Sequence, residues 1–326
     1  MYRIGMIGCG SISRVHVEGF LAIPEQARIT AVCDILPEAM DRVAEKVDGI
    51  ERFLDYNELI EKSGVDAVAV LLPHHLHKDC IVKAADGGKH ILCEKPLCIS
   101  LEEAEEITQA VESNNVTLMS AHNQMFSPCI QEAKRKLDAN EVGKIFQIRT
   151  CDCFLARLPE WGWRAKLATA GGGELIDTGY HPSYLLLHLA PSKPVAVTAM
   201  LGRYVQHEVE GEDCANVLVQ FEDGSIGFIY TSWAWEWPEG YHQFHVIGEK
   251  GQMYGRKNKF AVKLNDEEPI QTEFPERHEF QAEIEHFIEC LEKGTTPIQS
   301  HVDGIDVLKV ILGAYKATKT KGIVEL

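Results

Sequence analysis

The chain begins with the stretch that decides its fold, Tyr2-Arg3-Ile4-Gly5-Met6-Ile7-Gly8-Cys9-Gly10-Ser11-Ile12-Ser13. Residues 2–8 predict a short buried strand, and the apolar spacing over residues 11–23 predicts a helix directly after it. The first glycine of the turn permits a tight bend. The second lets a pyrophosphate approach the helix N-terminus, where N–H groups and the helix dipole favour anions. We therefore expect the backbone of Gly8, Gly10, Ser11 and Ile12 to bind the phosphates of a dinucleotide.

The second predicted strand supports this interpretation. Residues 28–33 are mostly apolar and end at Asp34, twenty-one residues after Ser13. A carboxylate there can accept hydrogen bonds from both ribose hydroxyls of NAD and would repel the 2′-phosphate of NADP. Residues 35–38 contain no arginine to hold that phosphate, so NAD is the expected cofactor. The alternative is a flavodoxin-like sheet in which the glycines only turn the chain.

The first third of the chain alternates strand and helix patterns. Further strands are predicted at residues 65–72, 90–93 and 116–121, with helices at 37–47, 76–85 and 101–113. Strands that alternate with helices indicate a parallel sheet, because parallel neighbours need crossover connections. We predict an α/β fold with a doubly wound parallel sheet.

The pattern changes after about residue 140. Long strand-like stretches occupy residues 145–154, 195–205, 215–221, 226–237 and 241–247, and Asp223-Gly224 is a strong hairpin signal. Helices are expected at 280–293 and 302–318. We predict a Rossmann domain over residues 1–122. An α+β domain for substrate binding and oligomerisation, with a large and mostly antiparallel sheet, is expected over 123–326.

Composition and charge exclude several classes of partner. The 326 residues carry a net charge of −17, which repels nucleic-acid backbones and anionic membrane surfaces. No apolar stretch approaches the roughly 20 residues of a membrane helix, and the start lacks the features of a signal peptide. The ten scattered cysteines are expected to be reduced thiols of a cytoplasmic protein. No metal site is expected, because Cys151-x-Cys153 has no second ligand pair nearby in sequence.

Three residues suggest catalysis by proton transfer. Lys95 follows the strand at 90–93, so it is expected beyond the carboxyl end of a parallel strand, where ligands bind. Asp177 and His181 are four residues apart after Gly171-Gly172-Gly173, and a helical turn would place them on one face. A carboxylate beside an imidazole fixes its tautomer and stabilises its protonated form. The alternatives without a catalytic role are that Lys95 is a solvent-exposed lysine, that Asp177 caps a helix and that His181 is unrelated to either.

The ordered set of motifs resembles the glucose–fructose oxidoreductase, inositol dehydrogenase and rhizopine-catabolism family, Gfo/Idh/MocA. The resemblance covers essentially the whole chain and supports Lys95, Asp177 and His181 as the catalytic residues. The motifs that carry it are Gly8-x-Gly10, Asp34, Pro73-His74-His75-Leu76-His77, Glu94-Lys95-Pro96, Trp163-Arg164, Gly171-Gly172-Gly173 and Asp177-x-Gly179-x-His181.

The resemblance also implies further binding residues. Glu94 and Lys95 would border the nicotinamide, and Trp163 and Arg164 would lie near both cofactor and substrate. His77 is expected to be a loop residue near the cofactor. The remaining cofactor residues would be Leu72, Pro73, His74 and Asn123, and the substrate residues Lys95, Arg164, Asp177, His181 and Trp235.

Three departures from the family pattern bear on the site. Ser13 replaces a glycine or alanine, and His74 stands where many members have asparagine; both should adjust cofactor affinity. Met125 stands where an arginine is frequent, which removes a charge from the expected pocket rim.

The tryptophans at 233, 235 and 237 occur at period two, so they are expected on one face of a strand. They could stack on a sugar ring or pack in a subunit interface, and a covered aromatic face suggests a homodimer or homotetramer.

We expect an NAD-dependent dehydrogenase acting on a secondary alcohol of a sugar, sugar derivative or cyclic polyol, a substrate class implied by the resemblance. One alternative is a glycosidase or epimerase that oxidises its substrate transiently. Another is a non-catalytic protein that senses NAD or a sugar.

Overall fold

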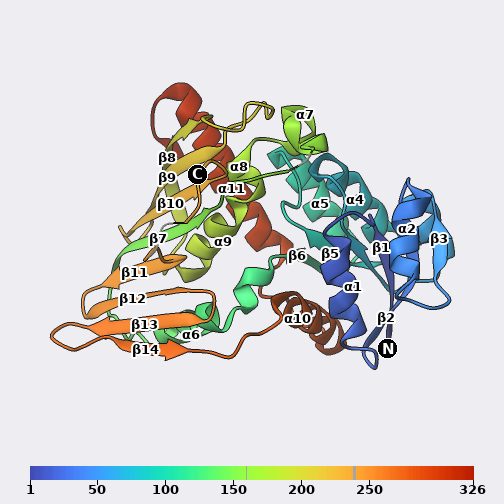
Figure 1. Cartoon of the computed structure of the whole chain (residues 1–326), viewed down its shortest axis with the longest axis horizontal. Helices are drawn as coiled ribbons and strands as arrows, with labels where there is room; N and C mark the ends of the chain where they lie inside the picture. The colour runs from blue at the N-terminus through green and yellow to red at the C-terminus, as the bar shows by residue number, and fades with distance from the viewer. Residues whose placement is uncertain (159, 238–239) are drawn as a thin grey trace. The chain divides into compact units, whose positions relative to one another are not determined.

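The computed structural model describes residues 1–158, 160–237 and 240–326, which form two compact units (Figure 1). The first comprises Met1–Asn123 and His278–Ile305, and the second Gln124–Arg277 and Asp306–Leu326. The sequence pattern placed everything after residue 122 in the second domain. The segment His278–Ile305 instead belongs to the first unit, because helix α10 (Glu279–Lys293) packs on α1 (Ser13–Leu21), with Ile284 against the backbone at Gly19.

The first unit contains a six-stranded parallel sheet in the order β3-β2-β1-β4-β5-β6. The predicted doubly wound fold is thereby confirmed. The sequence pattern missed β3 and α3, because β3 is only three residues long and begins with two exposed charged residues. The strands are β1 (Tyr2–Ile7), β2 (Ala27–Cys33), β3 (Glu51–Phe53), β4 (Ala67–Val70), β5 (His90–Glu94) and β6 (Leu118–Ala121), and the remaining helices before residue 124 are α2 (Pro37–Ala44), α3 (Tyr56–Lys62), α4 (His77–Asp86) and α5 (Leu101–Ser113).

The second unit contains a nine-stranded sheet in the order β14-β13-β12-β11-β7-β10-β9-β8-β15. The predicted hairpin at Asp223-Gly224 joins β9 to β10, and the sheet is antiparallel except where β10 pairs with β7. The strands are β7 (Ile145–Cys153), β8 (Pro194–Gly202), β9 (Cys214–Phe221), β10 (Ile226–Ser232), β11 (Phe244–Gly248), β12 (Gly251–Arg256), β13 (Lys259–Leu264), β14 (Ile270–Glu273) and β15 (Val324–Glu325).

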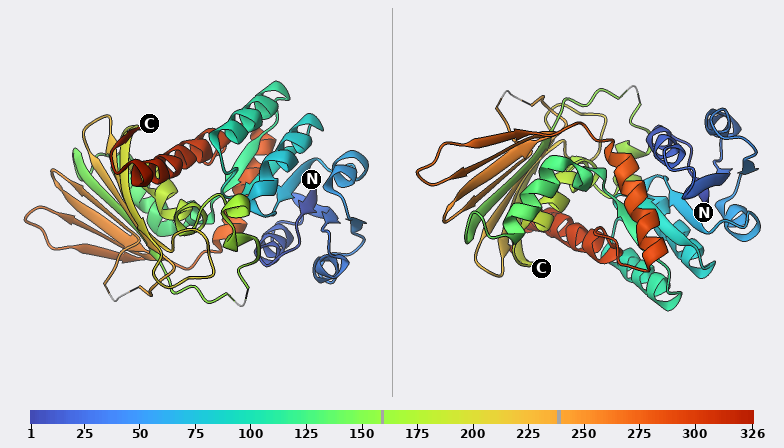
Figure 2. Two further views of the ribbon diagram at one scale, coloured as in Figure 1. Left: turned by 90° about the horizontal axis from the view of Figure 1, so that it is seen from above. Right: turned by 90° about the horizontal axis from the view of Figure 1, so that it is seen from below.

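Helices cover one face of this nine-stranded sheet, as Figure 2 shows. Buried and exposed residues alternate along β9, as expected for a strand with one covered face. The helices of the second unit are α6 (Pro128–Asp138), α7 (Leu167–Ala170), α8 (Glu174–Asp177), α9 (Tyr180–Leu189) and most of α11 (His301–Thr320). Within the described part of the chain, no helix combines the length and hydropathy needed to cross a membrane.

His77 ties together the loops that follow β4 and β5. Its Nδ1 lies 2.7 Å from the Pro96 carbonyl oxygen and its Nε2 lies 2.7 Å from that of Leu72. The side chain is fully buried at the first position of α4, so the expectation of a loop residue is wrong, whereas its place near the cofactor stays a prediction. The neutral ring carries one N–H and can donate to one of these two carbonyls, while its other nitrogen lies against the second; His77 thus packs between the two loops.

Gly173 lies where two backbones approach closely. A Cβ there would lie 2.1 Å from the carbonyl oxygen of Glu212, closer than packed atoms can come. The amide of Glu174 donates to the same oxygen at 2.8 Å. The close approach expected of the three-glycine run is therefore present at Gly173, and it fixes the start of α8.

We predict that Gly173→Ala lowers the free energy of unfolding by about 1–3 kcal/mol, the usual cost of overpacking. Gly322→Ala is the matched control, because its Cβ would meet no atom closer than 3.9 Å. Urea unfolding of both variants tests the difference, and equal stability of the two would contradict the assigned packing.

His77 should also make stability depend on pH. Burial lowers its pKa, although the carbonyls of Pro96 and Leu72 favour the charged form. Below about pH 6.5 the unfolded chain therefore binds a proton at His77 that the native state does not bind, so the free energy of unfolding falls as the pH drops. In His77→Gln the free energy of unfolding should fall less between neutral and acidic pH than in the wild type. His207 is exposed, so His207→Gln should show the same fall as the wild type. Urea unfolding between about pH 7 and 5 measures both slopes, and an unchanged slope in His77→Gln would refute the assignment.

Candidate functional site

The glycine turn after β1 is closed by Asp34. The backbone N–H of Cys9 donates to Asp34 Oδ2 at 2.7 Å, and that of Leu36 donates to Oδ1 at 2.9 Å. Gly8 has a φ of +96°, and a Cβ there would lie 2.4 Å from the Leu71 carbonyl oxygen. The geometry expected of the first glycine is therefore present, and the carboxylate lies beside the turn.

The surroundings of the turn fit a dinucleotide. Gly10 and Ser11 are exposed, Ile12 is half-buried, and a Cβ at Gly10 would meet nothing within 4 Å. Ser13 is buried, and its hydroxyl donates to the Gly10 carbonyl oxygen at 2.7 Å. The residue that departs from the fingerprint thus closes the turn, and open space remains above it for a pyrophosphate.

The strand order tells which half of the cofactor lies where. Strands β2 and β3 lie on one side of β1, and β4, β5 and β6 lie on the other, so the order reverses beside the glycine turn. Dinucleotides bind across such a switch point, beyond the carboxyl ends of the strands. With Asp34 after β2 on the adenosine side, the nicotinamide half would extend over β4 and β5, toward Glu94 and Lys95.

Glu94, the last residue of β5, is supported from behind by His16. His16 lies on α1, is fully buried, and places Nε2 2.8 Å from Glu94 Oε1. Burial raises the pKa of Glu94, but the hydrogen bond from His16 and the charges of His16 and Lys95 outweigh it and lower the pKa overall. Glu94 is therefore an anion at neutral pH, and the half-buried Lys95 follows it.

Other expected cofactor residues lie in the same unit. Leu72 and Pro73 are half-buried beyond β4, and His74 is buried in the short helix at His74–Leu76. Asn123, which ends the first segment of this unit, donates through Nδ2 to Glu279 of α10 at 3.0 Å.

In the second unit, Asp177 is paired with an arginine. Arg164 Nε lies 2.7 Å from Asp177 Oδ2, and its guanidinium carbon lies 4.2 Å from the centre of the Trp163 ring. Asp177 is 5% exposed, so its carboxylate is shielded from water, whereas the Arg164 side chain is partly exposed. The sequence placed Arg164 near the ligands but did not indicate that it holds the aspartate.

Asp177 and His181 do not lie in one uninterrupted helix. Asp177 ends α8, and His181 is the second residue of α9, after a bend at Thr178-Gly179. This break accommodates Pro182, which falls in the first turn of α9 where no intrahelical N–H is needed. His181 is half-buried.

Buried groups anchor α8. Thr231 of β10 donates to Glu174 Oε1, and the backbone N–H of Leu175 donates to Glu212 Oε1 at 2.9 Å. Tyr315 of α11 donates to the same oxygen of Glu212 at 2.9 Å. The helix that carries Asp177 is thus held by the sheet and by α11.

The tryptophan prediction is wrong in its geometry. Strand β10 ends at Ser232, so the three tryptophans do not share a strand face. Trp233 is buried against Trp161 and donates through Nε1 to Thr178 at 2.8 Å, whereas Trp235 is half-buried and stacks on Tyr230 with ring centres 5.4 Å apart. Trp233 and Trp235 therefore pack against different aromatic partners, and the proposed contact of Trp235 with substrate needs a separate test.

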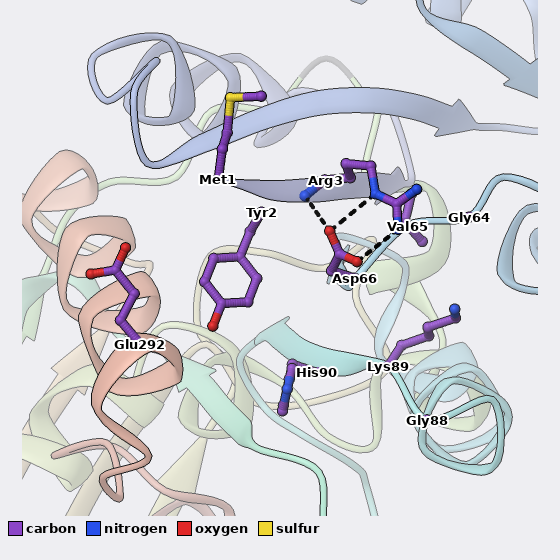
Figure 3. A pocket seen from close by; sticks show the side chains of 10 residues that line it. All are labelled: Met1, Tyr2, Arg3, Gly64, Val65, Asp66, Gly88, Lys89, His90 and Glu292. Atoms are coloured by element: carbon purple, nitrogen blue, oxygen red, sulfur yellow. Dashed lines mark hydrogen bonds and ion pairs between the residues drawn. The ribbon is translucent and has the colours of Figure 1, made fainter.

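A hollow of about 670 Å³ lies at the amino-terminal ends of β1, β4 and β5 (Figure 3). Arg3 and Asp66 line it and are already paired, with a nitrogen–oxygen distance of 2.8 Å. A ligand there would be at the amino ends of the strands, so this hollow is not the dinucleotide site.

Sequence reasoning missed three charged or titratable groups of the first unit. Arg42 of α2 donates to the Cys9 carbonyl oxygen at 3.3 Å. It lies beyond residues 35–38, the stretch in which an arginine for a 2′-phosphate was considered. His16 has no motif signal, and Glu283 lies on α10, which the pattern assigned to the other domain. Among the described residues, no group of three or more His, Cys, Asp or Glu side chains could hold a metal ion.

Comparisons with known proteins agree with this arrangement. Residues 2–122 match the model described as an oxidoreductase family with an NAD-binding Rossmann fold, and residues 130–254 match the GFO/IDH/MocA C-terminal domain. The chain is similar to scyllo-inositol 2-dehydrogenase (NAD(+)) of Bacillus subtilis (strain 168), at 28% identity over 96% of this chain and 92% of the relative.

Two further relatives extend the comparison. A 2,7-anhydro-N-acetylneuraminate hydratase of Mediterraneibacter gnavus is 30% identical over 75% of this chain and 68% of its own length. The crystal structure of an aldose-aldose oxidoreductase from Caulobacter crescentus, complexed with glycerol, superposes with a TM-score of 0.90 at 25% identity, covering 100% of this chain and 99% of the other. The chain therefore belongs to the Gfo/Idh/MocA family of oxidoreductases, and its cofactor is NAD.

Proposed function

We propose that the protein is an NAD-dependent dehydrogenase that oxidises a secondary alcohol of a sugar, sugar derivative or cyclic polyol. The observation that carries the proposal is the ion pair between Asp177 and Arg164, with Asp177 on α8 close in sequence to His181 on α9. The inositol dehydrogenase among the relatives acts on a cyclic polyol, which supports the substrate class.

The proposed chemistry needs a base and a cation at the same substrate oxygen. NAD, when bound, accepts a hydride at C4 of its nicotinamide. The carbon releases that hydride only as its hydroxyl proton is removed, and His181 is the proposed acceptor of the proton. Asp177, which pairs with Arg164, would stabilise the imidazolium that results.

Lys95 would act on the same oxygen as a cation. Its ammonium group donates a hydrogen bond to the hydroxyl oxygen and stabilises the charge that develops there as the proton leaves. The roles of Lys95 and His181 are interchangeable in principle, since a desolvated lysine can also serve as the base. In the reverse direction the same groups protonate the carbonyl oxygen as hydride returns.

Arg164 and Trp235 are the proposed substrate contacts besides the catalytic groups. Arg164 uses Nε for Asp177, and its terminal nitrogens would serve as donors to substrate hydroxyls. The ion pair with Asp177 offsets the arginine charge, which favours a neutral polyol over an acidic sugar. The face of Trp235 suits the C–H face of a sugar ring.

The hydratase relative supports a second candidate, transient oxidation. An enzyme that adds water to a sugar without net redox change can oxidise its substrate, carry out the addition and reduce the product again. The same three residues would serve that reaction, and the cofactor would return to NAD at the end of each turnover. Net production of NADH separates the two functions.

We also propose that the protein assembles as a homodimer or homotetramer in the cytoplasm, as the family resemblance suggests.

We predict that His181→Ala lowers kcat by roughly 10²–10⁴-fold, the usual contribution of a general base, while the Kd for NAD changes little. Steady-state NADH formation with a panel of polyols and sugars measures kcat, and fluorescence titration measures the Kd. His188→Gln on the same helix is the control, because His188 lies beside Lys134 and Asp138 and has no proposed role.

An unchanged kcat in His181→Ala would eliminate His181 as the base. A panel that yields turnover of substrate without accumulation of NADH would replace net dehydrogenation by transient oxidation. Binding of NAD and sugars without turnover of any of them would point to a sensor.

A further inference from the structure

A buried carboxyl group lies behind the proposed nicotinamide end of the crevice. Glu283, on α10, is fully buried, and neither of its oxygens has a hydrogen-bonding partner of good geometry among the described residues. An ionised carboxylate in such a place costs several kcal/mol unless donors satisfy it. The geometry therefore favours the neutral acid.

The charges around Glu283 act in the same direction. Burial raises its pKa well above the ordinary value, and the negative charges of Glu94 and Glu279 raise it further. The backbone N–H of His122 favours the ionised form but offsets only part of this. Glu94 is hydrogen-bonded to the imidazole of His16 and lies beside Lys95.

The two acids are therefore different in kind. Glu94 is ionised and pairs with His16, whereas Glu283 is fully buried and has no cationic partner among the described residues, the backbone N–H of His122 being the donor beside it. The Nδ1 of His16 is also buried and lacks a described partner, so no second proton donor reaches Glu283 from that ring. Ionisation of Glu283 would therefore add a further carboxylate charge beside those of Glu94 and Glu279.

We propose that Glu283 is a positioning residue that is protonated at neutral pH, and that its ionisation shifts the preference of the protein toward NAD⁺ over NADH. This inference rests on the proposed function for the position of the nicotinamide near Glu94. The oxidised ring carries a positive charge and the reduced ring is neutral, so a second nearby carboxylate favours only the oxidised form.

The first test needs no cofactor. The infrared spectrum of the wild type at neutral pH should contain the C=O stretch of a protonated carboxylic acid that is lost in Glu283→Gln. It should also titrate away in the wild type at alkaline pH, because burial raises the pKa of Glu283 well above its ordinary value. Glu289→Gln is the control, because Glu289 lies on the same helix, is exposed and pairs with Lys293. Identical protonated-acid bands in the wild type and Glu283→Gln would overturn the proposal.

The second test measures the Kd of NADH and of NAD⁺ from neutral to alkaline pH. The ratio of Kd for NADH to Kd for NAD⁺ should rise on the order of tenfold in the wild type and in Glu289→Gln, and stay flat in Glu283→Gln. Parallel profiles in the wild type and Glu283→Gln would refute the link to cofactor preference. Failure of every variant to bind either nucleotide would instead refute the proposed function, and the infrared result would still decide the state of Glu283.

Discussion

The first unit depends on the hydrogen bond between the Cys9 backbone and the Asp34 carboxylate, which spans the carboxyl ends of β1 and β2. It holds the glycine turn open to a pyrophosphate and places an acid where an adenosine ribose would lie. The strand order then leaves only β4 and β5 for the other half of the cofactor. His77 fixes the loops after those strands, so the crevice is built from backbone positions held by buried polar groups.

Buried acids of the protein fall into two classes according to their donors. Glu94 has His16 and Asp177 has Arg164, and in each case a hydrogen bond of 2.7–2.8 Å compensates the negative charge. Glu174 and Glu283 have no cationic partner in the described chain, and burial raises the pKa of each well above its ordinary value. Glu94 and Asp177 thus have partners that compensate a negative charge, while burial favours the neutral form of Glu174 and Glu283.

The sequence was most informative where backbone geometry dictates residue type. Gly8, Gly10 and Asp34 predicted the turn and the parallel sheet, because their spacing reflects one local unit. The return of His278–Ile305 to the first unit could not be predicted, because a helix that packs on a distant helix shows only an ordinary amphipathic pattern. The sequence also could not predict two pairs, because they join residues that are far apart or in separate elements. These pairs are His16–Glu94 and Arg164–Asp177.

The central claim is that Lys95, Asp177 and His181 surround one reacting carbon beside the nicotinamide. A crystal structure of the protein with NADH and a polyol that it oxidises tests this directly. The account predicts Lys95 Nζ and a ring nitrogen of His181 within roughly 2.6–3.2 Å of the same substrate oxygen, with the Asp177 carboxylate against the imidazole. A ternary complex in which either side chain points away from the substrate oxygen, with the nicotinamide and polyol in contact, would contradict it.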